Sequence, residues 1–82
     1  MDADFASLWE SKKQIAAIIA DDVSQSTPAR AEDIAVILRE FTSLPTPRNR
    51  DEFLRRSRTF ISLNFELDSI AAEERRSARG SH

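Results

Sequence analysis

The chain has 82 residues, a formal net charge of −2 and no cysteine. This length supports one domain, and a domain of this size buries only about 60% of its unfolded surface, so its core is marginal. The lack of cysteine excludes disulfides and thiolate metal sites, and the single histidine, His82, excludes a histidine-based metal site. We therefore predict no metal and no cofactor, and expect self-association or a partner protein to reinforce the fold.

The first helix is predicted at about residues 4–23, with Asp2 or Asp4 as its N-cap. Its apolar residues recur at intervals of three and four, which predicts a buried face. This face consists of Phe5, Leu8, Trp9, Ile15, Ala16, Ile19 and Val23, and Ile18 lies off it. Trp9 has two interpretations: a residue at the edge of the core, or an anchor for a partner, because tryptophan is enriched at binding hot spots.

The second helix is predicted at about residues 28–43. Thr27 provides a hydroxyl at the N-cap and Pro28 stands at the first helical position. Its apolar face comprises Ala31, Ile34, Ile37, Leu38, Phe41 and Leu44. Pro45 and Pro47 then disfavour helix in the residues before them, which predicts a stiff, extended link.

The third helix is predicted at about residues 50–76, with Asn49 as its N-cap and two carboxylates in its first turn. Two apolar lines run along it, about 100° apart. The first has the spacing of a helix packed on other helices and consists of Phe53, Phe60, Leu63, Leu67, Ile70 and Ala71. The second consists of Leu54, Ile61 and Phe65.

The second line admits two interpretations, which the sequence leaves open. It either widens the core face, or it meets another chain, because a large exposed apolar patch on a small protein usually marks an interface. In the second case Asn64, between the two lines, resembles a polar residue that sets the register of pairing at some cost in stability.

Together these elements predict an all-α fold, a three-helix antiparallel bundle with a longer third helix, assembling as a dimer. The domain spans residues 1–76, and the third helix from about Asp68 onward has nothing evident to cover it. Residues 77–82 read as a disordered polar tail whose Arg-Gly-Ser-His ending resembles the remnant of an affinity tag. The longest apolar run, Ile15 to Ala20, is too short to cross a bilayer, and a cytoplasmic location is expected.

No catalytic residues are predicted, because the chain lacks cysteine and tyrosine and has no glycine-rich loop. We predict a non-enzymatic protein-binding module, a regulator, inhibitor or adaptor acting by docking. Its candidate contact residues are Leu54, Arg55, Arg58, Ile61, Phe65 and Trp9. The alternative is nucleic-acid binding through the arginines that open the third helix, Arg48, Arg50, Arg55, Arg56 and Arg58. The low isoelectric point of about 5.3 argues against this alternative.

Overall fold

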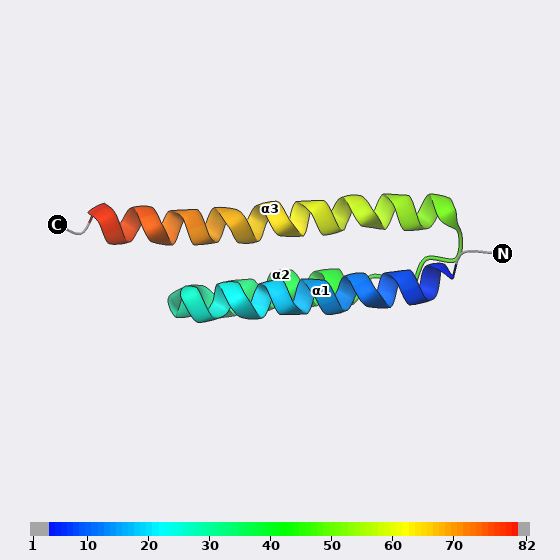
Figure 1. Cartoon of the computed structure of the whole chain (residues 1–82), viewed down its shortest axis with the longest axis horizontal. Coiled ribbons are helices and arrows are strands. Elements are labelled where there is room, and N and C mark those ends of the chain that lie inside the picture. Colours follow the sequence, from blue (N-terminus) through cyan, green and yellow to red (C-terminus); the bar gives the residue numbers. More distant parts are fainter. Residues whose placement is uncertain (1–3, 81–82) are drawn as a thin grey trace.

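The computed structural model describes residues 4–80, with side chains up to residue 77. Three helices make up this part of the chain, α1 at Phe5–Ser26, α2 at Ala31–Thr42 and α3 at Arg50–Gly80 (Figure 1). A short 3-10 turn at Pro28–Arg30 precedes α2. The described residues contain no strand, so the predicted all-helical class is confirmed.

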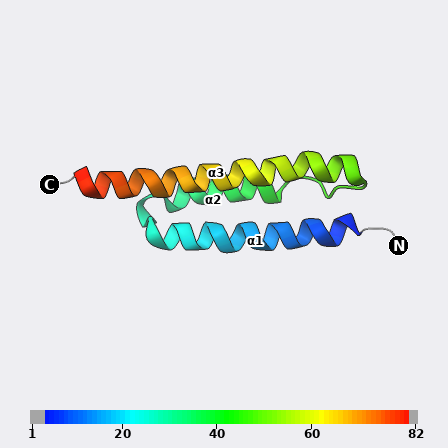
Figure 2. The same ribbon diagram turned by 45° about the horizontal axis from the view of Figure 1, so that its top comes forward.

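The helices pack side by side in a rod with principal-axis extents of 58 × 18 × 16 Å. In Figure 1, α1 and α3 run in the same direction along the rod, and α2 runs in the opposite direction. Figure 2 shows α2 beside α3, with the C-terminal end of α3 extending past both shorter helices. Because the rod is so narrow, each helix keeps a broad outer face.

The core lies along the line where the three helices meet. Trp9 of α1, Phe41 of α2 and Leu67 of α3 are almost completely buried in it. Phe41 is the hub of its aromatic contacts, since its ring centroid lies 4.9 Å from that of Trp9 and 5.8 Å from that of Phe60. Ala16 and Ala20 are buried too, and their short side chains let α1 approach its neighbours closely.

The start of α3 follows the predicted capping chemistry. The Asn49 side chain accepts a hydrogen bond of 3.0 Å from the backbone N–H of Glu52. The Glu52 carboxylate reaches back to the backbone N–H of Arg48 at 3.1 Å and also contacts Arg56 at 3.2 Å. The backbone N–H groups of Glu52 and of Arg48, which precedes the N-cap, are therefore both satisfied by side chains of the helix start. Asp4 caps α1 in the predicted way, accepting from the Ser7 backbone at 3.1 Å.

The prediction for Thr27 is right in position and wrong in chemistry. Thr27 is the N-cap of the 3-10 turn, with Pro28 at its first position, but its side chain makes no capping hydrogen bond. Its hydroxyl instead donates back to the carbonyl of Val23. Thr27 is 1% exposed, so its hydroxyl needs a partner inside the fold, and the end of α1 supplies it. The residues after Pro28 then form the 3-10 turn, and α2 begins at Ala31, three residues later than predicted.

The C-terminal ends of α1 and α3 also differ from those predicted. Helix α1 continues to Ser26, and α3 continues to Gly80, so residues 77–80 belong to a helix and not to a disordered tail. No proline or glycine interrupts the chain between Arg50 and Gly80, so nothing stops the helix earlier. The rest of the predicted tail, residues 81 and 82, lies outside the described residues.

The part of α3 beyond Asp68 is better covered than predicted. Ile70 is buried, and Arg30, the last residue of the 3-10 turn, forms an ion pair of 3.2 Å with Glu73. Arg30 also pairs with Asp33 at 2.7 Å. These two carboxylates, Asp33 first, raise the pKa of the Arg30 guanidinium. Arg30 therefore links Glu73 of α3 to the turn between α1 and α2, whereas residues 75–77 are exposed.

Candidate protein-docking surface

The apolar residues of α3 divide between the core and the outer surface. Leu63 and Leu67 are buried, while Leu54, Ile61 and Phe65 are 48%, 54% and 69% exposed. We call these three exposed residues the outer line of α3. The interpretation that they widen the core face is therefore wrong, because α3 packs against α1 and α2 through residues of the first line.

Single exposed hydrophobic residues are ordinary on soluble proteins. The outer line differs because its members stand seven and four residues apart, which places them on one face of the helix. Phe65 also borders a shallow groove between α2 and α3, whose other walls include Arg30, Ile37 and Ile70. A partner residue could enter this groove beside the Phe65 ring.

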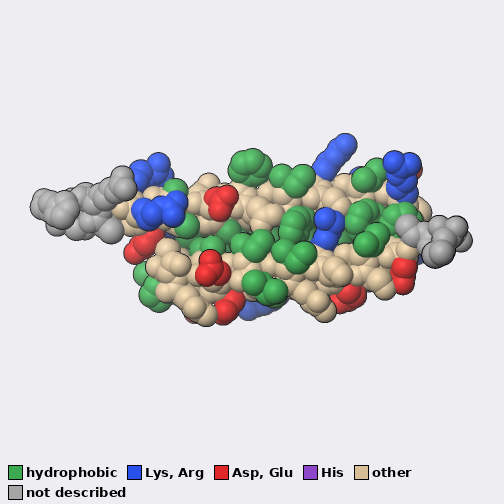
Figure 3. Space-filling model, in the orientation of Figure 1, with side chains coloured by type: hydrophobic (Ala, Val, Ile, Leu, Met, Phe, Trp, Pro, Cys, Tyr) green, Lys and Arg blue, Asp and Glu red, His purple; other side chains and the backbone are tan. Residues whose placement is uncertain are grey.

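A second exposed line, on α1, escaped the sequence reasoning. Leu8, Ile15 and Ile18 are 45%, 47% and 68% exposed. Leu8 and Ile15 were expected in the core. They lie at the edge of the apolar face of α1, and this face is wider than the surface that α1 packs against α2 and α3. The signal that could have revealed them is their spacing of seven and three residues. In Figure 3, hydrophobic side chains gather along the seam between α1 and α3 and on the outer surface of α3.

Lys12 lies within this seam. Its ammonium group stands over the rings of Phe60 and Phe53, 4.9 and 5.7 Å from their centroids. The ammonium group therefore covers the faces of two half-buried rings, a favourable cation–π arrangement. Beside it, Phe5 and Phe53 meet with ring centroids 5.5 Å apart.

Trp9 does not belong to the docking surface. It is 0% exposed, and it contacts Phe41 in the core. Its indole nitrogen finds no hydrogen-bond partner in the described part of the chain. Since a residue without accessible surface cannot anchor a partner, Trp9 takes the structural role that was its other interpretation.

Charged residues flank the outer line. Arg55 and Arg58 are exposed, whereas Arg56 is part-buried and paired with Glu52. Arg48 and Arg50 are exposed near the start of the helix. The bond from the Arg48 backbone, followed by that from Arg56, lowers the pKa of Glu52. Arg56 therefore pairs with the capping carboxylate at the helix start and is less accessible than the other arginines of this region.

Asn64 lies between the two apolar lines, as predicted, and it is half-buried. Its side chain makes no hydrogen bond within the described residues. It is therefore available to a neighbouring molecule.

The described residues contain no cluster of three or more potential metal ligands. Within the same part of the chain, no helix is both long and apolar enough to cross a membrane. Comparisons with protein families, with curated proteins and with solved structures find no match to the chain. The case for a function therefore rests on the surface itself.

Proposed function

We propose that the chain is a non-enzymatic protein-binding module whose contact surface is the outer line of α3. The observation that carries this proposal is the exposure of Leu54, Ile61 and Phe65 on a bundle whose core is already closed. Exposing three large apolar side chains in a row costs solubility, and proteins tolerate this where the surface is covered by another protein. A regulator, inhibitor or adaptor that acts by docking fits such a surface.

The surroundings of the outer line support the same function. An apolar centre with charged residues beside it is the usual anatomy of an interface, in which the centre supplies affinity and the rim supplies specificity. Arg55 and Arg58 provide such a rim, and arginine is enriched at interface hot spots. Asn64 adds an uncommitted amide at the edge of the patch.

Nucleic-acid binding is the second candidate, favoured by the exposure of Arg48, Arg50, Arg55 and Arg58 around the start of α3. Two features weaken it: Arg56 is engaged with Glu52, and the net charge of the chain is −2. Binding to phosphates would weaken steeply as salt is raised. A titration with duplex and single-stranded oligonucleotides at low and high salt tests this candidate, and no binding at low salt would remove it.

The docking proposal is tested with Ile61→Asp and Phe65→Asp. Both side chains are more than half exposed, so we expect the folded state to survive while binding to a protein is lost. Val36→Asp is the matched control, because Val36 is 46% exposed but stands alone on α2. Far-UV circular dichroism and the fluorescence of Trp9 report folding. Sedimentation velocity and affinity capture from the source cell report binding.

Two results would count against the proposal. Unfolding of both variants would mean that the outer line maintains the bundle itself. Retention of every interaction by both variants would mean that the contact surface lies elsewhere.

A further inference from the structure

The outer line belongs to a longer regular pattern on α3. Residues along this face follow intervals of three and four in strict alternation, the heptad spacing of a helix that pairs with another helix. The pattern comprises Asp51, Leu54, Arg58, Ile61, Phe65, Asp68, Ala72 and Arg75, which we call the α3 stripe. Seven of these residues are exposed and Ala72 is half-buried. The stripe is therefore a second seam on α3, separate from the one that closes the core.

The stripe is complementary to a second copy of itself that runs in the opposite direction. When two copies of a heptad seam pair in antiparallel orientation, the first residue of one copy faces the last residue of the other. In this arrangement Arg58 faces Asp68 of the other copy, and Asp51 faces Arg75. Ile61 faces Phe65, and Leu54 faces Ala72. Each charged residue meets the opposite charge, and each apolar residue meets an apolar one.

A parallel arrangement lacks this property. It would place Arg58 against Arg58 and Asp68 against Asp68 of the other copy, and like charges in facing positions are destabilising. The pattern therefore selects one relative direction. The antiparallel arrangement has a two-fold axis near residue 63, so every favourable pair occurs twice, as in the symmetric dimers that dominate among soluble oligomers.

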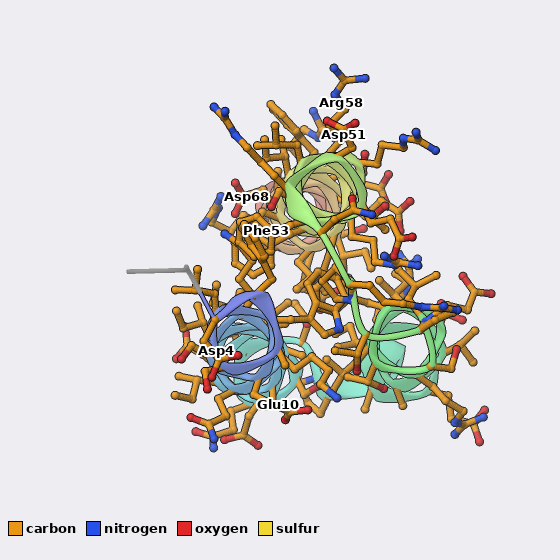
Figure 4. The ribbon with its side chains drawn as sticks, turned by 90° about the vertical axis from the view of Figure 1, so that its right-hand side faces the viewer. Asp4, Glu10, Asp51, Phe53, Arg58 and Asp68 are labelled. Atoms are coloured by element: carbon orange, nitrogen blue, oxygen red, sulfur yellow. The ribbon has the colours of Figure 1, made fainter. Side chains whose placement is uncertain are left out.

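The charged members of the stripe are available for such pairs. Among the described side chains, the ion pairs involve Lys13, Arg30 and Arg56 with acidic partners, and none involves Asp51, Arg58, Asp68 or Arg75. Figure 4 shows Asp51 and Arg58 projecting from α3 on the side away from α1 and α2, and Asp68 on its flank. Within the described side chains, these four charges thus have no ion pair, and they stand in the positions where a second copy would supply the opposite charge.

From this complementarity we infer that the occupant of the outer line is a second copy of this chain, with the two α3 helices antiparallel and Arg58 opposite Asp68. The inference rests on the proposed docking role of the outer line and specifies its partner. Asn64 then lies close to its own symmetry mate beside the axis, where paired asparagines can fix the register. The stripe extends over about 36 Å at about 1.5 Å per residue, enough for several turns of helix pairing.

A charge-exchange experiment tests the pairing of Arg58 with Asp68. The variants Arg58→Glu and Asp68→Arg each place like charges opposite one another in the dimer, so we expect at least a tenfold weaker dimer from each, by sedimentation equilibrium at low salt. An equimolar mixture of the two variants restores both attractive pairs and should form a heterodimer. The double variant should likewise recover the dimer. Arg39→Glu is the charge-matched control, because Arg39 is exposed on α2, outside the stripe.

The register is tested by cross-linking, which is clean because the chain has no cysteine. Chains carrying Leu54→Cys and chains carrying Ala72→Cys are mixed and mildly oxidised. We expect a mixed disulfide between the two kinds of chain and little cross-linking of either kind alone. A parallel pair would instead join Leu54→Cys chains to each other.

Several results would overturn the inference: a wild-type chain that is monomeric at every concentration, a dimer indifferent to both charge reversals, or a tighter dimer in Arg58→Glu. Failure of the docking proposal looks different. If the wild type is monomeric but binds a different protein that Ile61→Asp no longer binds, the outer line is still a docking surface and only its occupant is wrong. If neither apolar variant changes any binding, both proposals fail.

Discussion

The ring of Trp9 on α1 packs against the ring of Phe41 on α2, with centroids 4.9 Å apart and planes inclined at 47°. Both side chains are almost completely buried, and Phe41 continues the contact to Phe60 on α3. One aromatic cluster therefore joins all three helices. In a domain with so little interior, these rings account for a large share of the apolar surface that folding removes from water.

We expect Trp9→Ala to destabilise the domain by about 3–5 kcal/mol, the usual cost of emptying the space of a buried large aromatic residue. Trp9→Phe should cost much less. It retains an aromatic ring, and it removes an indole N–H that is buried without an acceptor. Urea unfolding followed by far-UV circular dichroism measures both changes. Equal losses from the two variants would contradict the central position of the cluster.

The third helix was the most predictable part of the chain. Its N-cap at Asn49, its start at Arg50 and its core line through Leu63 and Leu67 all follow from local capping and helical periodicity. These signals depend only on residues within a few turns of one another. The solvated face could be predicted for the same reason: Glu66 and Glu73 lie away from both apolar lines and are exposed.

What sequence reasoning missed depends on neighbours distant in sequence. Whether Leu8 and Ile15 are covered depends on how close α2 and α3 come to α1, and a helical wheel does not show this. Thr27 has the chemistry of an N-cap, but its burial turned the hydroxyl toward Val23. The sequence identified the outer line as a separate group of apolar residues. Whether these residues are exposed depends on how the three helices pack, and only the structure shows this.

Thr27→Val should cost about 1 kcal/mol, the net contribution of one intramolecular hydrogen bond. Valine fills the space of threonine, and the Val23 carbonyl keeps its other bond, from the Thr27 backbone N–H at 2.8 Å. Thr27→Ala should cost more, because it also removes a buried methyl group worth about 0.8 kcal/mol or more. Urea unfolding monitored by Trp9 fluorescence measures the series. A Thr27→Val variant as stable as the wild type would show that the hydroxyl contributes nothing.

Acid should weaken the helix starts of α1 and α3. The pKa of Asp4 is lowered by the hydroxyl of Ser7 and then by its backbone N–H, and that of Glu52 chiefly by the Arg48 backbone. A carboxyl group whose pKa is lowered by folding stabilises the protein above its unfolded pKa and loses that contribution as the pH falls through the folded value. We therefore expect stability to be constant near neutral pH and to decline below about pH 4.

Asp4→Asn isolates this effect, because asparagine caps a helix about as well as aspartate but does not titrate. The midpoint of urea unfolding, measured from pH 7 to pH 3, should fall less steeply in Asp4→Asn than in the wild type. Asp4→Ala serves as the comparison, since it should be less stable than Asp4→Asn at every pH. An unchanged pH profile in Asp4→Asn would mean that the Asp4 carboxylate does not contribute to the acid response.

The thermal midpoint should depend on protein concentration, because a ligand that binds only the folded state stabilises it by mass action, and here the proposed ligand is the protein itself. Leu54→Ala, at an exposed position of the stripe, should reduce that dependence. Ile34 on α2 is 1% exposed, and Ile34→Val should reduce the free energy of unfolding by about 1 kcal/mol. This variant should therefore lower the thermal midpoint at all concentrations and leave its dependence on concentration unchanged. Differential scanning calorimetry over a hundredfold concentration range separates the two effects. If both variants shift the midpoint equally at every concentration, Leu54 acts through the stability of the single chain, and its exposure on α3 serves no second copy.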